Sequence, residues 1–255
     1  PLTDISDKNV GELGIAWTAD LEDARGQEAT PVVVDGVMYV THAWSKVSAW
    51  DAATGKPLWK FDPKVPGESA VNACCDVVNR GVALWGDKVF VGTIDGRLIA
   101  LDRKTGTEMW STLTVDPTKP YTITGAPRVV KDMVLIGNGG AEFGVRGYVT
   151  AYEADTGKER WRFYTAPNPT KAKDGAASDE IFATKANATW SDTGEWQTSG
   201  GGGTVWDAIV YDKDLDQVYL GVGNGNPWNH GTRSNGEGDN WFLSSIVALD
   251  ASTGA

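Results

Sequence analysis

The chain has 255 residues, which is enough for one large all-β domain or two smaller domains. Its 34 acidic and 23 basic side chains give a formal net charge of −11, which argues against binding to nucleic acid or to an anionic membrane surface. An acidic surface instead suits the docking of a positively charged partner. No apolar run approaches the roughly 18 residues of a membrane span. The sequence opens at Pro1 without a charged-then-apolar leader, as expected of a processed mature protein.

An internal repeat runs through the chain. The pattern Ala, any residue, an acid, three residues and Gly begins at Ala49, Ala100, Ala151 and Ala248. The first two intervals are 51 residues each and the third is 97 residues. We therefore expect an insertion in the third interval, and the change in composition places it at about 165–203.

Each repeat predicts four short strands. Runs of strand-forming residues at 30–41 and 81–93 are divided by turn dipeptides, Asp35-Gly36 and Gly86-Asp87. A third strand ends at the Ala-x-acid element, and we expect a fourth strand to begin at the Trp that follows the Gly. Helical periodicity is not sustained over ten or more residues anywhere. The prediction is an all-β propeller with about four four-stranded blades.

The Trp of each repeat is expected to fill a seam between neighbouring blades, with its ring buried and its N–H paired. These residues are Trp59, Trp110 and Trp161. Their placement once per repeat favours packing over catalysis, and it resembles the tryptophan-docking motif of quinoprotein propellers, a family with eight blades. The fourth motif ends at Ala255 before its Trp. Residues 1–255 are therefore expected to be the N-terminal half of a single eight-bladed propeller domain.

Cys74 and Cys75 are adjacent and are the only cysteines. A disulfide between neighbours is strained and persists where the surrounding structure enforces it, in an exported protein. Two unpaired buried thiols are the alternative, and the residues alone leave both open. The segment CCDVVNR, from Cys74 to Arg80, resembles that of alcohol dehydrogenases dependent on pyrroloquinoline quinone (PQQ). The resemblance implies a vicinal disulfide lying flat against the cofactor, in a periplasmic protein.

Other motifs extend this resemblance across the chain: QEATPVVVDGVMYV from Gln27, TITGAPRVV from Thr122, and GGGGTVWDAIVYD from Gly200. Taken singly, each matching residue could have a purely structural role, as an exposed strand end or as an ordinary strand residue. Together they imply a cofactor site with a flat surface on each side of the ligand. They also imply a guanidinium group that can donate two hydrogen bonds to a carboxylate or to a quinone oxygen. The residues implied to bind PQQ are Glu28, Cys74, Cys75, Arg80, Thr124, Gly140, Ala141, Thr204 and Trp206.

A metal site is implied beside the cofactor. The stretch GNGGAEFGVRG resembles the family's calcium loop, in which Glu142 is a ligand. Asn224 lies eighteen residues after Trp206 and matches an amide ligand, although a turn would also favour Asn there. Carboxylate and amide oxygens suit calcium, and a lanthanide is the alternative. The stretch lacks the third Gly of a dinucleotide fingerprint.

The resemblance implies oxidation of alcohols, either primary alcohols or carbohydrate hydroxyls, to aldehydes by hydride transfer to PQQ. Electrons would pass to a cytochrome c or to a fused haem domain. The catalytic Asp is expected beyond residue 255, so no base is assigned here; Asp250 is interpreted as a turn residue. The alternative is a non-catalytic quinoprotein-like propeller that acts as a scaffold or binding module.

Overall fold

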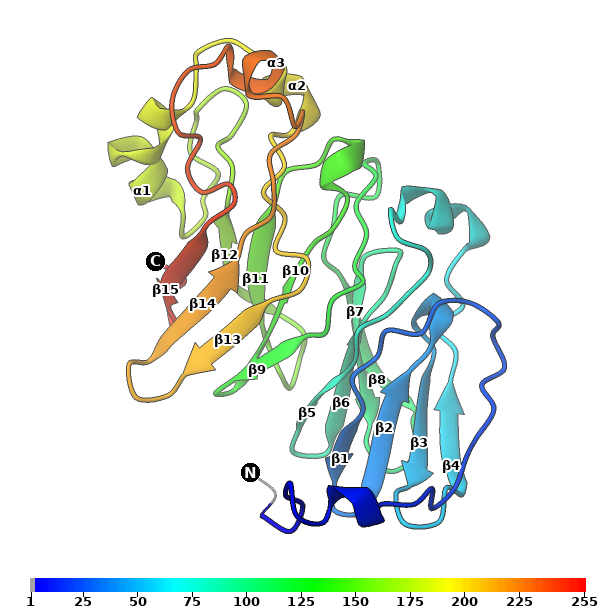
Figure 1. Ribbon diagram of the computed structural model, residues 1–255. Coiled ribbons are helices and arrows are strands. Elements are labelled where there is room, and N and C mark those ends of the chain that lie inside the picture. Colours follow the sequence, from blue (N-terminus) through cyan, green and yellow to red (C-terminus); the bar gives the residue numbers. More distant parts are fainter. Residues whose placement is uncertain (1–2) are drawn as a thin grey trace.

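Four antiparallel sheets follow one another along the chain (Figure 1) in a computed structural model that describes residues 3–255. Pro1 and Leu2 lie outside the described residues. The strands are β1 (Val32–Val34), β2 (Val37–Thr41), β3 (Val47–Asp51), β4 (Pro57–Phe61), β5 (Ala83–Trp85), β6 (Lys88–Gly92), β7 (Arg97–Asp102), β8 (Glu108–Leu113), β9 (Arg128–Val130), β10 (Met133–Gly137), β11 (Tyr148–Glu153), β12 (Glu159–Tyr164), β13 (Ile209–Asp212), β14 (Gln217–Gly221) and β15 (Ile246–Asp250).

The helices are few and short, so the prediction of an all-β fold is confirmed. The α-helices are α1 (Asp179–Thr184), α2 (Trp196–Ser199) and α3 (His230–Ser234). The 3-10 helices are Val10–Glu12, Ala43–Ser45, Gly67–Asn72, Ala141–Phe143 and Ala186–Thr189. Within residues 3–255, none of the helices has the length and apolar character that crossing a bilayer requires.

Each sheet is a blade whose strands are paired in chain order. The first three blades have four strands, and the fourth has β13, β14 and β15. In the first blade, Asp35 and Gly36 take φ of 51° and 75° and close the β1–β2 hairpin, as the turn dipeptide predicts. The first strands lie nearest the common axis, because β9 contacts both β5 and β13. The expected blade architecture is therefore present in the described residues.

The fourth strand of each complete blade begins two residues before the Trp, not at it. In the first blade, Ala49 pairs with Trp59, and a register shift then lets Trp50 pair with Pro57. The same shift follows Ala100 and Ala151. The extra residue of this bulge lies on the fourth strand, immediately before the Trp. The pairing of the third and fourth strands therefore extends beyond the Trp toward the turn that joins them.

The repeated Trp residues fill the seams between blades, as expected. The ring of Trp59 packs on Gly106 of the next blade, where a Cβ atom would lie 2.5 Å from the ring. Its Nε1 donates to the carbonyl of Arg103 at 3.1 Å. Trp110 repeats this arrangement on the third blade, donating to Ala154 at 3.2 Å. The ring thus links two blades by packing and by a hydrogen bond.

Trp161 departs from the expectation that every indole N–H is paired. Its ring packs on Gly254 of the fourth blade, but its Nε1 is buried with no hydrogen-bond partner among residues 3–255. At this seam the ring keeps its contact with the glycine turn without the indole hydrogen bond.

Trp17 is a further docking residue that the repeat pattern did not reveal. Its ring packs on Gly55 of the first blade, and its Nε1 donates to Ala52 at 3.1 Å. The acidic repeat motif does not precede Trp17 in the sequence, so the spacing carried no signal for it.

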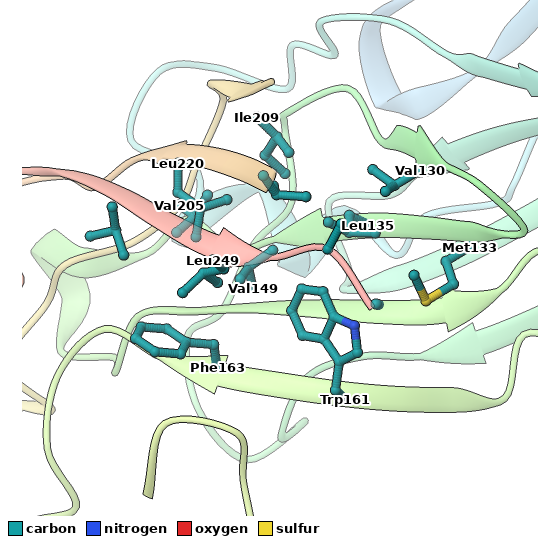
Figure 2. Close-up of a cluster of buried hydrophobic side chains, with 14 of the residues drawn as sticks. Val130, Met133, Leu135, Val149, Trp161, Phe163, Val205, Ile209, Leu220 and Leu249 are labelled. Atoms are coloured by element: carbon teal, nitrogen blue, oxygen red, sulfur yellow. The ribbon is translucent and has the colours of Figure 1, made fainter. Parts of the chain in front are cut away.

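The seam between the third and fourth blades contains the largest apolar cluster of the described residues. Figure 2 shows side chains from both blades meeting there, with the Trp161 ring among them. Leu135 and Val149 of the third blade and Leu220 of the fourth are fully buried. Apolar burial between adjacent sheets is the main force that stacks the blades.

The additional length of the fourth blade lies in two excursions, of which the first covers the insertion expected at about 165–203 and the second was not expected. The first excursion joins β12 to β13 over residues 165–208, and the second joins β14 to β15 over 222–245. Only four residues make the equivalent connection between β6 and β7. The second excursion is rich in Gly and Asn, and its length was hidden in the same repeat interval.

The docking contact can be tested with Gly106→Ala in the full-length protein. The added Cβ atom would clash with the Trp59 ring, and the alanine would have to adopt a φ of 71°, which is unfavourable for a residue with a side chain. Gly36→Ala is a matched control, because its φ is 75° and no atom lies within 4 Å of the added Cβ. The strained φ should cost both variants about 1–2 kcal/mol, and overpacking should cost Gly106→Ala roughly 1–3 kcal/mol more. Urea unfolding measures both values, and equal losses would contradict the docking role.

Candidate functional site

The strand directions bring the candidate site residues to one end of the blades. Glu28, Arg80, Thr124 and Trp206 each precede the first strand of a blade. Glu142 and Asn224 lie in connections between the second and third strands. In an antiparallel sheet, the start of the first strand and the second-to-third connection share one end. The glycine turns between the third and fourth strands, which the repeated Trp residues contact, lie at the opposite end of the blades.

Four of these residues form one contiguous group. Arg80 pairs with Glu28 at 2.7 Å and donates from Nη1 to Thr124 Oγ1 at 2.6 Å. Its guanidinium also lies over the Trp206 ring, 5.0 Å from the centroid. The Arg80 side chain is largely buried, whereas Trp206 is 46% exposed. The group therefore presents an aromatic ring and cationic and anionic groups on one surface.

Cys74 and Cys75 are joined by a disulfide, and both residues are exposed. The segment that follows is held firmly. Asn79 is buried and donates from Nδ2 to the carbonyl of Gly92 at 2.8 Å, while its own carbonyl accepts from Thr41 Oγ1 at 3.2 Å. These bonds fix the segment between the first and second blades and aim Arg80 into the site.

A run of four glycines, Gly200 to Gly203, passes between the loop that carries Glu142 and the loop that carries Asn224. All four have φ between 73° and 80°, a left-handed conformation that favours glycine. Gly202 makes backbone bridges to Arg146 on one side and to Gly225 on the other. The run leads to Thr204, which is buried, and its carbonyl accepts from the N–H of Gly223 at 2.9 Å.

The expected metal ligands lie on either side of this run. Glu142 is exposed and has no hydrogen-bond or ion-pair partner among residues 3–255, and it follows Gly140 and Ala141, both of which are buried. Asn224 is also exposed and donates from Nδ2 to Gly225 at 3.2 Å, which leaves its Oδ1 unpaired within the same range. No group of three or more His, Cys, Asp or Glu is placed to hold a metal among residues 3–255.

Arg146, four residues after Glu142, is bound to a different carboxylate. Its Nη1 and Nη2 donate to the two oxygens of Asp174 at 3.0 and 2.7 Å, and its Nε donates to Ala166. Both side chains are largely buried, at 10% and 16% exposed. Burial opposes ionisation of Asp174, but hydrogen bonds from Arg146 and Asn168 outweigh it and lower the pKa of the carboxyl. The pair ties the first excursion to the loop that carries Glu142.

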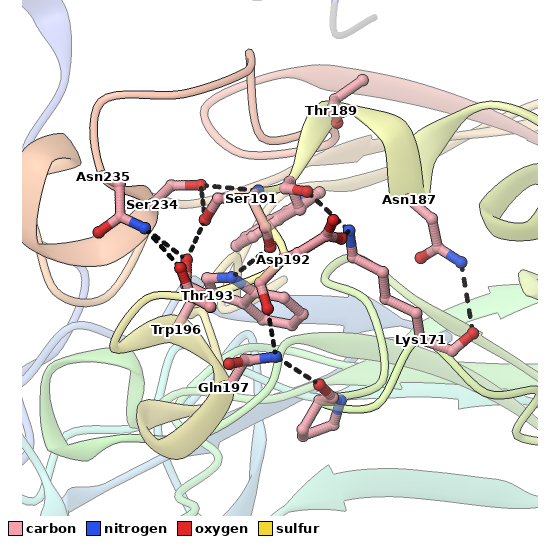
Figure 3. Close-up of polar contacts among 12 residues, drawn as sticks. Lys171, Asn187, Thr189, Ser191, Asp192, Thr193, Trp196, Gln197, Ser234 and Asn235 are labelled. Atoms are coloured by element: carbon pink, nitrogen blue, oxygen red, sulfur yellow. Dashed lines mark hydrogen bonds and ion pairs between the residues drawn. The ribbon is translucent and has the colours of Figure 1, made fainter.

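The two excursions of the fourth blade are bonded to each other. Figure 3 shows Ser191 of the first excursion bonded to Ser234 of the second, and Asn235 bonded to Thr193. Trp190 donates from Nε1 to the carbonyl of Trp241 at 2.6 Å. The excursions therefore form one unit at this end of the fourth blade, and Asn224 belongs to the second of them.

Direct side-chain contacts thus join Glu28, Arg80, Thr124 and Trp206. Backbone bonds through the glycine run connect the loops of Glu142 and Asn224. Within residues 3–255, no side-chain hydrogen bond or ion pair links the first set to the second. The ion pair of Arg146 with Asp174 was not foreseen, because residues 28 positions apart carry no spacing signal.

Comparison with known proteins identifies the family. The family model for PQQ proteins described as "Glucose/ethanol/alcohol dehydrogenase, beta-propeller domain" matches residues 1–255. The chain belongs to this PQQ dehydrogenase propeller family. A β-propeller domain accounts for the repeat and for the pairing of strands within each blade.

Similar proteins include the dehydrogenase subunit of a quinone alcohol dehydrogenase from Komagataeibacter europaeus, 59% identical over the whole chain and over 35% of that protein. The structure of the quinohemoprotein alcohol dehydrogenase ADHIIG from Pseudomonas putida HK5 is 56% identical, with a TM-score of 0.94, over all of this chain and 36% of that one. A europium-containing methanol dehydrogenase is 39% identical, with a TM-score of 0.86, over 99% of this chain and 44% of that one. The chain thus spans about a third of the curated relatives' length.

The Arg146–Asp174 pair predicts a pH-dependent anchor for the first excursion. In the full-length protein, Asp174→Asn leaves a largely buried guanidinium uncompensated, and we expect it to destabilise the excursion by about 3 kcal/mol or more. Because the folded pKa is lowered, the contribution of Asp174 is complete above its unfolded pKa of about 4 and is lost as pH falls through the folded pKa. Hydrogen exchange of the excursion at pH 7 and at lower pH measures both effects.

The control is Asp192→Asn, which removes the exposed pair of Asp192 with Lys171 from the same excursion. Asp192 is 94% exposed, so a change well below 1 kcal/mol is expected. If both variants left exchange unchanged, the anchoring role of Arg146 would be refuted.

Proposed function

We propose that the full-length protein containing this chain is a periplasmic PQQ-dependent alcohol dehydrogenase that oxidises primary alcohols, or carbohydrate hydroxyls, to aldehydes. The observation that carries the proposal is the group of Glu28, Arg80, Thr124 and Trp206, assembled at the end of the blades that also bears the Cys74–Cys75 disulfide. Its support from relatives is the high identity to alcohol dehydrogenases that use quinone or are quinohemoproteins.

The chemistry of the site residues fits PQQ, which is a flat tricarboxylate o-quinone. Arg80 is a planar donor that can meet a carboxylate or a quinone oxygen. Trp206 is half-exposed and offers a flat apolar surface, and the exposed cystine offers another. The hydroxyl oxygen of Thr124 accepts a hydrogen bond from Arg80, so its O–H can donate a hydrogen bond to a polar atom at the edge of the ligand. These residues would bind and orient the cofactor.

The donor set also fits a hard cation. Glu142 supplies a carboxylate without a basic partner among residues 3–255, and Asn224 supplies an amide oxygen. Two protein ligands are too few for calcium, which takes six to eight oxygens. Oxygens of the cofactor and of residues beyond 255 are proposed to complete the shell. Calcium is our proposal, and a lanthanide is the alternative, as in the europium-containing relative.

When bound, PQQ supplies a two-electron quinone acceptor for hydride from the alcohol carbon, and calcium supplies a Lewis acid. The residues of this chain hold these groups in place and carry no catalytic base. Asp250 is committed to a turn, because its Oδ1 accepts from Ser252 N and from both the N–H and hydroxyl of Thr253. We place the general base, an Asp, beyond residue 255.

The proposed partners follow from the same scheme. The C-terminal half of an eight-bladed ring would complete the domain, and a cytochrome c or a fused haem domain would accept the electrons. The formal charge of −11 suits a positively charged acceptor. A scaffold or binding propeller is the alternative function, and it gives no reason for Arg80, Glu142 and Trp206 to occur with the vicinal cystine.

The first test is the absorption spectrum of the full-length protein from its source, before and after addition of a primary alcohol. A bound quinone band that changes with alcohol is the expected result, and a haem signal would identify a fused acceptor. No quinone band after reconstitution with PQQ and calcium would leave the scaffold as the better explanation.

Glu142→Gln tests the metal site, because it keeps the side-chain shape but removes the charge that a hard cation requires. We expect the calcium-dependent affinity of the full-length protein for PQQ to fall by about tenfold or more. Glu108→Gln, at an exposed position on β8, is the control and should bind like the unaltered protein. Equilibrium dialysis against PQQ with calcium or europium gives the affinities and the metal preference.

Trp206→Leu tests the aromatic wall. Loss of stacking should weaken PQQ binding by roughly three- to tenfold, the range set by the energy of an aromatic pair. Tryptophan fluorescence quenched by PQQ should also be reduced. Trp228→Leu removes a tryptophan that is 72% exposed and should change neither value. Equal effects of the two changes would argue against a specific role for Trp206.

A further inference from the structure

Two segments about 50 residues apart in sequence run side by side next to the cystine. At one end, Arg25 pairs with Asp76, its Nε donating to Oδ2 at 3.2 Å and its Nη2 to Oδ1. At the other end, Glu28 pairs with Arg80 at 2.7 Å. The N–H of Thr30 then donates to the carbonyl of Arg80 at 3.1 Å. The N-terminal segment is thereby fastened along the segment that carries the disulfide.

Asp76 is placed to control the shape of the chain directly after the cystine. It has a φ of 72°, in the left-handed region, and it forms a backbone bridge with Cys74. Its Oδ1 accepts from Val77 N at 2.7 Å, and its Oδ2 accepts from Gly26 N at 3.4 Å. The carboxylate therefore receives two backbone donors in addition to the two from Arg25.

We propose that Arg25 and Asp76 are positioning residues that hold the Cys74–Cys75 ring in a fixed orientation at the cofactor site. The part of this inference that concerns the cofactor rests on the proposed function. Neither residue is expected to touch PQQ. They act by fixing the turn after the cystine and by tying it to the segment that carries Glu28. A rigid surface costs less entropy when a flat ligand packs on it.

An ordinary exposed ion pair would not have this effect. The side chains of Arg25 and Asp76 are 51% and 33% exposed, and such pairs commonly contribute little. The difference here is that the carboxylate also fixes two backbone N–H groups beside the disulfide. Asp35 is a close comparison, because it has a positive φ of 51° and its carboxylate pairs with Arg103 at a distance of 3.0 Å. This pair does not adjoin the cystine in sequence.

The experiment uses the full-length protein prepared without PQQ, with Asp76→Asn, Arg25→Gln and the control Asp35→Asn. The first measurement is the rate at which a water-soluble phosphine reduces the cystine, followed by thiol release. We expect the Asp76 and Arg25 variants to be reduced about fivefold faster or more, since hydrogen bonds to a charged group are lost. Arg25→Lys keeps the charge without the fork and should give an intermediate rate.

The second measurement is the affinity for PQQ in the presence of calcium, which should weaken by about fivefold or more in the Asp76 and Arg25 variants on the same grounds. Asp35→Asn should change neither the reduction rate nor the affinity. Thermal unfolding of every variant shows whether it is folded, and Arg25→Lys serves if Asp76→Asn does not fold.

Unchanged reduction rates in the Asp76 and Arg25 variants would overturn the inference, as would an equal acceleration in Asp35→Asn. Faster reduction with unchanged PQQ affinity would overturn the positioning role toward the cofactor. If the unaltered protein binds no PQQ, the proposed function fails instead. The reduction rates then support or overturn the hold on the cystine by themselves.

Discussion

The contact between a tryptophan of one blade and a glycine turn of the next determines the geometry on which everything else depends. The Trp59 ring occupies the space that a Cβ atom of Gly106 would fill, and Trp110 does the same at Gly157. A glycine turn cannot move closer without a clash or farther without losing the contact. Each blade is therefore set at a fixed rotation from its neighbour, and the first strands converge on one axis.

This convergence assembles the candidate site from loops that are distant in sequence. The N–H of Thr30 donates to the carbonyl of Arg80, and the N–H of Arg80 donates to the carbonyl of Thr124. Backbone hydrogen bonds thus cross from the first blade to the second and from the second to the third at the same depth. Because the backbone is fixed there, Arg80 can contact Glu28, Thr124 and the Trp206 ring together.

The sequence predicts the blades well because their features are local. Turn dipeptides, strand alternation and the spacing from Ala49 to Trp59 lie within one repeat. The motifs also point to the residues that the fold gathers at one end. The second excursion was missed because its length shared an interval with the first. The pairs of Arg25 with Asp76 and of Arg146 with Asp174 were missed because side chains so far apart in sequence meet only through tertiary packing.

The ion pairs around the site also explain why its proposed ligand atoms stay available. Arg146 is the basic residue nearest to Glu142 in sequence, and a pair between them would neutralise the carboxylate. The first excursion instead supplies Asp174, whose two oxygens occupy the guanidinium fork. A bidentate, largely buried partner outcompetes an exposed one, because its charges are screened less by water. Glu142 is therefore left without an ion-pair partner among residues 3–255, and its carboxylate oxygens, which are ligands of the kind that a hard cation prefers, stay available.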